Sequence, residues 1–359
     1  MTAILFILVL LILIFVHELG HFLVAKLSKI KVHEFALGFP PKIWGKKVGE
    51  TEYTLNIVPF GGFVKIHGEN PDELPENDPD AGRSMVNKPW YTQIAVLIAG
   101  IAFNIIFAWM LITTAYMIGY PTASEKVTGD SSISIVSVAK DSPAEKAGIS
   151  TGDYIVSISL GDKFIEPKSV EEVRSIIKAS QGSEITLNYV HKGETKTSVI
   201  TPETNNSDKT PMIGISMTVV DLLNYPFWQA PWEGLKTTFE VTKGTIVGLA
   251  KLIKDSVMGN GSLGAVTGPV GIAGMIGDAS DFGFAYLLGF TAFISINLAV
   301  INLVPFPALD GGRIFVILIE TISRRKIPAK IQAYVNIGGF LILIGLMVLV
   351  TIRDIGKLF

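Results

Sequence analysis

Four stretches of the chain are almost continuously apolar, and each is long enough to cross a lipid bilayer as a helix. They cover residues 3–25, 94–119, 284–304 and 331–351. A transmembrane helix needs roughly 20 apolar residues, because the hydrocarbon core of a bilayer is about 30 Å thick. The first stretch follows no Lys or Arg and has no small-residue cleavage site after a short apolar core, so we expect a retained helix rather than a signal peptide.

The segments between the apolar stretches contain patterns typical of strands, a loop and a small domain. Residues 50–69 alternate apolar and polar side chains around Pro59, Gly61 and Gly62, which predicts a pair of strands around a turn. The acidic, proline-containing residues 69–80 predict an exposed loop. Residues 131–201 contain four short β-rich runs (134–138, 154–158, 184–190, 195–200) and two helical patterns (143–147, 170–179), which suffice for one small α+β or β-barrel domain.

A further amphipathic segment precedes the third apolar stretch. Residues 232–257 place apolar side chains at helical spacing with Lys and Glu between them, which predicts a helix on the membrane surface with Trp228 and Trp232 at headgroup level. The glycine-rich residues 259–277 favour no stable straight helix.

The predicted fold is therefore membrane α-helical, with four transmembrane helices, a membrane-associated β-hairpin and one extramembrane domain. We divide the chain into residues 1–121, 122–225, 226–282 and 283–359.

Composition agrees with an integral membrane protein, since 49% of the 359 residues are hydrophobic and only 17% are charged. The formal net charge of -2 offers no basic surface of the kind that nucleic acids require, so we exclude that class of partner. The chain has no cysteine, which excludes disulfides and thiolate metal sites.

Basic residues near the apolar stretches predict the orientation in the membrane. Lys26, Lys29 and Lys31 follow the first stretch, and the cluster 324–326 (Arg, Arg, Lys) lies between the third and fourth stretches. Basic connections stay in the cytoplasm. Both termini and the long connection 120–283 should then lie outside.

Three polar residues interrupt the first apolar stretch, in "ILIFVHELGHFLVAKL". Polar and ionisable groups in hydrocarbon cost a few kcal/mol each, so their presence needs a reason. On a helix His17 and His21 lie on one face and can share one Zn²⁺, while Glu18 is placed to act as general base on a zinc-bound water. The alternative is that both histidines are ordinary buried residues with hydrogen-bonded partners.

Catalytic zinc usually takes three protein ligands. His33 and His67 are possible third ligands, and His191 lies in the outside domain. A better candidate is Asp310, in "NLVPFPALDGG" at the end of the third apolar stretch, because Pro305 and Pro307 break the helix there and allow Asp310 to turn toward the first helix.

These paired motifs resemble those of the site-2 proteases, the intramembrane zinc metalloproteases, and "TEYTLNIVPFGGFVKIHGE" and "GPVGI" are similar to their bacterial RseP/RasP-type branch. The resemblance implies zinc as cofactor, His17, His21 and Asp310 as ligands, and Glu18 as catalytic base. It implies substrate contacts at a set of eight residues: Asn302, Pro305, Pro307, Gly61, Gly62, Phe63, Val64 and Lys65. An exposed strand edge can bind an extended peptide through backbone hydrogen bonds, which gives the last five a physical basis.

The same resemblance implies regulated intramembrane proteolysis in the bacterial cytoplasmic membrane. Expected substrates are single-span proteins already shortened by an upstream site-1 protease, such as anti-sigma factors, or remnant signal peptides. Residues 141–158 ("DSPAEKAGISTGDYIVSI") resemble the core of a bacterial PDZ domain, the alternative being an unrelated small β domain. Two departures are that there is room for one such domain where the branch commonly has two, and that Ile101 stands where it usually has proline.

Two other function classes remain open on the sequence. A metal transporter or zinc sensor could use the same ligands, although transport would be expected to need charged sites along several spans and we find one cluster. A non-catalytic scaffold that binds partners through its PDZ domain would not need Glu18 as a base.

Overall fold

The computed structural model describes residues 2–69, 78–124, 132–161, 163–180, 182–191, 193–204, 210–259 and 267–356. Most of the predicted loop 69–80 lies outside the described residues. The chain divides into two compact units. The helical unit comprises Met1–Ile112, Pro231–Ile276 and Thr291–Phe359, and the sheet unit comprises Thr113–Ala230 and Gly277–Phe290.

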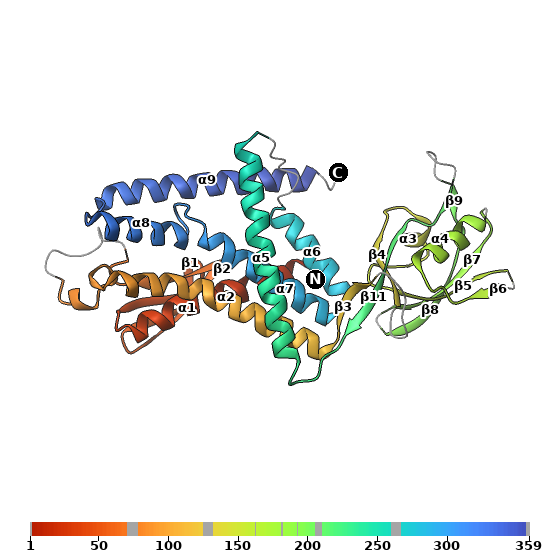
Figure 1. Cartoon of the computed structure of the whole chain (residues 1–359), viewed down its shortest axis with the longest axis horizontal. Coiled ribbons are helices and arrows are strands. Elements are labelled where there is room, and N and C mark those ends of the chain that lie inside the picture. The colour runs from red at the N-terminus through yellow and green to blue at the C-terminus, as the bar shows by residue number, and fades with distance from the viewer. Residues whose placement is uncertain are drawn as a thin grey trace. The chain divides into compact units, whose positions relative to one another are not determined.

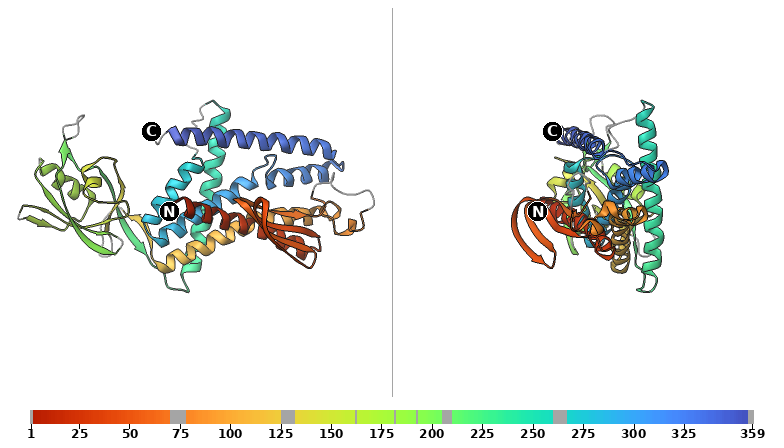
Figure 2. Two further views of the ribbon diagram at one scale, coloured as in Figure 1. Left: turned by 180° about the vertical axis from the view of Figure 1, so that it is seen from behind. Right: turned by 90° about the vertical axis from the view of Figure 1, so that its left-hand side faces the viewer.

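Four helices of the described chain are long and apolar enough to cross a membrane, as predicted. They are α1 (Thr2–Leu27), α2 (Trp90–Ile118), α7 (Phe284–Leu303) and α9 (Ala329–Gly356). The helix α8 (Asp310–Ser323), which was not predicted from the sequence, lies beside α9 (Figures 1 and 2). Two short 3-10 helices, Ala81–Arg83 and Met85–Asn87, precede α2.

The predicted surface helix is α5 (Ala230–Val257), which runs across the direction of α9 in Figure 1. Trp109 of α2 donates a 2.8 Å hydrogen bond from Nε1 to the Pro231 carbonyl oxygen and so fixes the start of α5. The structure confirms this helix, and its place on a membrane surface stays a prediction.

The expectation of no straight helix in residues 259–277 was wrong for its second part, where α6 (Pro269–Asp281) begins. Proline suits the first helical position, where its missing N–H is not needed. Asp354 of α9 is buried, and its Oδ2 accepts hydrogen bonds from the backbone N–H groups of Gly268 (2.8 Å) and Gly271 (2.9 Å). These bonds satisfy donors that every helix start leaves free.

The prediction that residues 50–69 form two strands paired with each other around a turn was wrong. One strand, β2 (Thr51–Ile66), covers that range and pairs with β1 (Val32–Val48), which the sequence reading missed. Residues 34–37 of β1 pair on one side with 62–65 and on the other with 52–55, while 42–48 pair with 51–56. Residues 62–66, the edge segment, have no strand on their outer side in the described part of the chain.

The sheet unit holds a sheet in the order β3-β11-β4-β5-β7-β8, with β6 beside β5 and with β9 and β10 paired separately. The strands are β3 (Tyr120–Ser124), β4 (Ser132–Val138), β5 (Tyr154–Leu160), β6 (Lys163–Ile165), β7 (Ile185–His191), β8 (Glu194–Ile200), β9 (Glu203–Thr204), β10 (Pro211–Met212) and β11 (Ile215–Leu223). The helices are α3 (Pro143–Lys146) and α4 (Val170–Ala179). All four predicted β runs and both helical patterns are confirmed, whereas five strands were missed: β3, β6, β9, β10 and β11.

The core of the sheet unit explains why these segments fold together. Ile133, Ile158, Val173 and Leu187 are at most 2% exposed and belong to one cluster drawn from sheet and helix. Ser169 caps α4 by accepting a hydrogen bond from the Glu172 N–H at 3.1 Å, which is the Ser-x-x-Glu pattern of a helix start.

Candidate metal centre

The first helix presents both histidines to one point inside the helical unit. His17 and His21 are 8% and 7% exposed, and their Nε2 atoms lie 3.2 Å apart. The spacing of four residues places both rings on the same face of α1. The alternative that these are ordinary buried histidines must therefore explain why their Nε2 atoms converge on one point.

The carboxylate of Asp310 lies beside the His17 and His21 side chains. Its Oδ2 lies 3.1 Å from His17 Nε2 and 3.3 Å from His21 Nε2. Oδ2 is buried and accepts no hydrogen bond of proper geometry among the described residues. A buried carboxylate oxygen between two imidazole nitrogens, with no donor aimed at it, fits a shared cation.

The distances suit zinc in particular. Zinc bonds to nitrogen and oxygen of about 2.0–2.1 Å in a tetrahedron separate neighbouring ligand atoms by about 3.3–3.4 Å. The three separations here are 3.1, 3.2 and 3.3 Å. One ligand atom from each of His17, His21 and Asp310 lies within 4.8 Å of the others, and no other such group of His, Asp or Glu occurs in the described residues.

The sequence brings Asp310 to this point through a tight turn between α7 and α8. Its glycines are required, because a Cβ on Gly311 would lie 2.3 Å from the Leu303 carbonyl oxygen and one on Gly312 would lie 2.2 Å from that of Phe306. Asp310 is thus the first residue of α8, rather than a residue that ends α7.

The other two candidate histidines form a separate cluster. His33 Nε2 lies 3.0 Å from His67 Nδ1, and His67 Nε2 lies 2.7 Å from Asp78 Oδ2. His191 pairs with Asp153 in the sheet unit at 2.7 Å. The structure therefore places Asp310, and neither His33 nor His67, beside the His17 and His21 pair.

Two groups outside α1 orient the histidine rings. His21 Nδ1 donates a 2.8 Å hydrogen bond to the Val96 carbonyl oxygen, which leaves Nε2 free to bind a metal. On the other ring, His17 Nδ1 lies 3.3 Å from the side-chain amide of Asn104, which is fully buried. The Asn104 Oδ1 has no partner among the described residues, and a half-turn of the amide lets it accept the Nδ1–H of His17.

Asn104 and Gly100 are functional candidates that the sequence reading missed. A Cβ on Gly100 would lie 2.4 Å from His21 Nε2, so only glycine allows α2 to pass this close to the site. The signal for Asn104 was available, since it is an amide inside the apolar stretch 94–119.

A cavity of about 340 Å³ opens onto the three ligand candidates. It is lined by ten residues: His17, Glu18, His21, Phe63, Val64, Lys65, Ile66, Glu69, Leu97 and Asp310. Three of the eight predicted substrate contacts are in this set. Gly62 lies beside it, since its Cβ position would be 3.7 Å from Glu18 Cγ. Gly61, Asn302, Pro305 and Pro307 do not line the cavity, and their roles stay predictions.

Comparison with known proteins agrees with this chemistry. The family model described as Peptidase family M50 matches residues 5–346. A Clostridium perfringens protein that carries the name "Putative zinc metalloprotease" is 41% identical over 344 residues, which cover 96% of this chain and 95% of that protein. The "Regulator of sigma-W protease RasP" of Bacillus subtilis is 29% identical, and the match covers 100% of this chain and 99% of that protein. The "Zinc metalloprotease RasP" of Geobacillus kaustophilus is 28% identical, and the match covers 97% of this chain and 96% of that protein.

Among solved structures, the PDZ domain of an SdrC-like protein from Listeria monocytogenes matches 26% of this chain and 92% of that domain. The identity is 30% and the TM-score is 0.23.

Proposed function

Because the chain belongs to peptidase family M50 and is a zinc metalloprotease of the membrane, we propose that it hydrolyses peptide bonds at the centre formed by His17, His21 and Asp310. The observation that carries this proposal is the convergence of three ligand atoms within 4.8 Å, two of them on α1, a helix apolar enough to cross a membrane, and one on α8. In this assignment contacts with α2 fix the directions of His17 and His21, and the tight turn before α8 fixes that of Asp310.

Zinc, when bound there, supplies a Lewis acid that polarises the scissile carbonyl and lowers the pKa of a bound water to about 7. Glu18 follows His17 on α1 and lines the same cavity. We assign it as the general base, which takes a proton from the attacking water. The water oxygen bonds to the carbonyl carbon, the C–N bond breaks, and Glu18 passes the proton to the leaving nitrogen.

The edge segment is the proposed substrate clamp. Phe63, Val64 and Lys65 line the cavity, and the outer side of the segment is open among the described strands. An extended peptide can add to such an edge through backbone hydrogen bonds, whatever its sequence. A helical substrate has its carbonyl groups bonded within the helix, so pairing with the edge segment would hold it unwound. Asn302, Pro305 and Pro307 are proposed as additional contacts.

We further assign the chain to regulated intramembrane proteolysis of single-span substrates. Two relatives carry the name RasP, one of them as a regulator of sigma-W, which supports anti-sigma factors as a substrate class. Such substrates, or remnant signal peptides, would first be shortened by a separate site-1 protease. The basic residues around Lys29 and Arg325 support a cytoplasmic-membrane orientation with both termini and the proposed PDZ domain outside.

The test compares the wild type with Glu18→Gln in detergent, measuring zinc content and cleavage of a fluorescent single-span substrate with and without a zinc chelator. We expect stoichiometric zinc in both proteins and a loss of cleavage of at least about 10²-fold in the variant, because a positioned base contributes 10²–10⁴-fold. Chelation should abolish cleavage by the wild type. Equal cleavage by both proteins would refute the role of Glu18, and bound zinc without cleavage by either would favour a sensor or transporter.

A further inference from the structure

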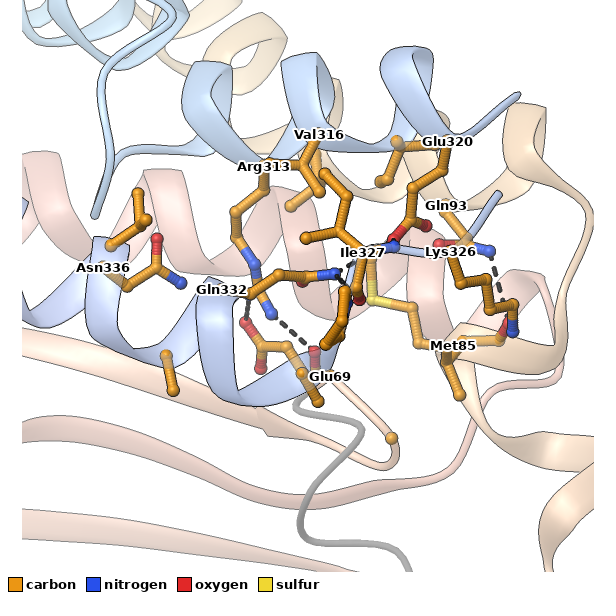
Figure 3. A pocket seen from close by; sticks show the side chains of 18 of the residues that line it. Glu69, Met85, Gln93, Arg313, Val316, Glu320, Lys326, Ile327, Gln332 and Asn336 are labelled. Carbon is orange, nitrogen blue, oxygen red and sulfur yellow. Dashed lines mark hydrogen bonds and ion pairs between the residues drawn. The ribbon is translucent and has the colours of Figure 1, made fainter. Parts of the chain in front are cut away.

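Arg313 of α8 holds Glu69 by two contacts. Its guanidinium forms an ion pair with the Glu69 carboxylate, and its Nη2 donates a 2.6 Å hydrogen bond to the Glu69 backbone carbonyl oxygen. Figure 3 shows the Arg313 side chain extending from its helix to Glu69. Charge-assisted bonds of this kind are roughly twice as strong as neutral ones. The contact thus fixes the backbone at residue 69 as well as the side chain.

Glu69 is in turn joined to the edge segment. Its N–H donates a 3.3 Å hydrogen bond to the Ile66 carbonyl oxygen, and Ile66 is the last residue of β2. His67, within this turn, donates its N–H to the Lys31 carbonyl oxygen at 2.9 Å. A displacement of Glu69 would therefore be passed directly to the end of the segment.

The other end of the contact is fixed relative to the metal centre. Arg313 lies one helical turn after Asp310, so the two side chains leave α8 on neighbouring positions of one face. The helix start cannot slide, because Gly311 and Gly312 are packed against backbone atoms of the preceding turn. Arg313 therefore links the proposed clamp to the helix that carries a proposed zinc ligand.

The contact also stands at the boundary between two cavities. Glu69 and Leu97 line the cavity of the metal centre and also a second cavity of about 590 Å³. The second cavity is lined by Arg313 and by polar side chains that include Gln93, Glu320 and Gln332, several of which Figure 3 shows around it. Polar side chains in a membrane bundle face a water-filled space. The Arg313 and Glu69 side chains are 26% and 29% exposed, so the partner of a removed charge keeps access to water and the fold should survive the removal.

We propose that Arg313 is a positioning residue that sets the register of the edge segment against the metal centre, and so decides which peptide bond of the substrate is cut. The role rests on the proposed function, since it requires that a substrate pairs with the edge segment. A peptide added to a strand is held at a fixed offset from it. If the segment can shift relative to Asp310, the same bound peptide presents a different carbonyl for hydrolysis.

The period of a β-strand makes this prediction specific. A slip of one residue turns every substrate side chain to the opposite face, whereas a slip of two residues restores the same faces. When Arg313 is removed, additional cleavage should appear mainly two residues from the original bond. A residue that only stabilises the fold would reduce the yield of product without moving the bond that is cut.

The experiment uses the full-length zinc-loaded protein in detergent with a panel of synthetic single-span signal peptides, and mass spectrometry to identify the products. Arg313→Gln removes both contacts. Glu69→Gln removes the ion pair but keeps the backbone acceptor. Arg313→Lys keeps the charge but replaces the planar, forked guanidinium by a compact ammonium on a shorter side chain, which does not reproduce the geometry of the two contacts. Lys326→Gln is the matched control, because it removes a positive charge from the wall of the second cavity without contacting Glu69.

We expect one main cleavage bond for the wild type and for Lys326→Gln. Arg313→Gln should produce a second product set displaced by two residues, and kcat/KM at the original bond should fall about tenfold, the effect of losing a charge-assisted hydrogen bond. For Glu69→Gln and Arg313→Lys, kcat/KM at the original bond should lie between the values of the wild type and of Arg313→Gln. Zinc content and thermal midpoint are measured on each variant, and both should match the wild type.

Two results would overturn the proposal in different ways. Cleavage by Arg313→Gln at the wild-type bond alone, with kcat/KM unchanged or lowered only in step with the thermal midpoint, would remove the positioning role and leave the proposed function standing. Absence of cleavage by the zinc-loaded wild type across the whole panel would refute the proposed function, and the positioning role with it.

Discussion

His17 and its partner Asn104 show how much of the centre depends on single side chains far apart in the chain. The two residues are 87 positions apart, and Asn104 is fully buried. Its backbone carbonyl oxygen also accepts a 2.8 Å hydrogen bond from Ser295 Oγ, which connects α2 to α7. The backbone of Asn104 is therefore held in place beside His17, and a half-turn of the amide would let its Oδ1 orient the imidazole.

Replacing Asn104 by Leu should weaken zinc binding by about 10–100-fold, the usual effect of losing an outer partner of a metal-bound histidine. Asn104→Asp keeps an oxygen that accepts the Nδ1–H of His17, and we expect it to retain zinc. The measurement is competition for zinc with a chromophoric chelator, on proteins whose folding is checked by circular dichroism. Equal zinc affinity in Asn104→Leu and the wild type would show that His17 needs no such partner.

At the scale of elements, a small network of charges joins three segments at one end of the helical unit. Glu50, in the turn between β1 and β2, accepts hydrogen bonds from Arg83 at 2.6 and 2.7 Å and from Lys26 of α1 at 2.6 Å. The bonds from Arg83, and then those from Lys26, lower the pKa of Glu50 from 4.5 to about 2. The network therefore holds the β1–β2 sheet to the end of α1.

The sign of this shift gives a pH dependence. Because the folded pKa lies below the unfolded value, ionised Glu50 stabilises the fold above pH 4.5, and the contribution is lost as the pH falls through about 2. Glu50→Gln should lower the thermal midpoint at pH 7 by about 2 °C, since exposed pairs contribute little. The difference between variant and wild type should shrink below pH 4.5. Thermal scans in detergent at pH 7, 4 and 2.5 test this, and a constant difference would contradict it.

At the scale of the molecule, the chain combines a helical unit that holds the metal centre with a sheet unit inserted into it. The ends of the inserted sheet are neighbours, because Tyr120 pairs with Leu223 and Pro121 pairs with Leu222. Residues 122–222 can therefore be replaced by a short linker. We propose that the sheet unit acts as a size filter, which would exclude substrates that still carry bulky outer domains.

Replacing residues 122–222 by a short Gly-Ser linker should increase cleavage of full-length single-span substrates relative to substrates already shortened. The reason is that a filter acts by excluding large outer domains from the path to the centre. The ratio of the two initial rates, compared with that of the intact chain, measures the effect. An unchanged ratio would refute the filter role.

The helices and the ligand candidates could be read from the sequence because their signals are local. Long apolar stretches predict membrane spans without reference to neighbours, and polar residues inside them, such as His17 and Glu18, stand out against hydrocarbon. Four strands of the sheet unit, β4, β5, β7 and β8, could also be predicted from short β-rich runs. The assignment of Asp310 needed a further step, the recognition that two prolines break a helix where it should continue.

Other features depended on contacts between segments that are distant in sequence, which no local pattern encodes. The pairing of β1 on both sides, the cap that Asp354 places on α6, and the approach of Gly100 to His21 each require a partner elsewhere in the chain. The Arg313 and Glu69 contact spans 244 positions and joins two residues that are each unremarkable alone. The sequence by itself thus determined the membrane class and the chemical groups of the centre, because hydrophobicity and ligand type are properties of single residues. Only the tertiary structure decided how those groups are oriented and what holds the edge segment beside them, because orientation is a property of packed pairs.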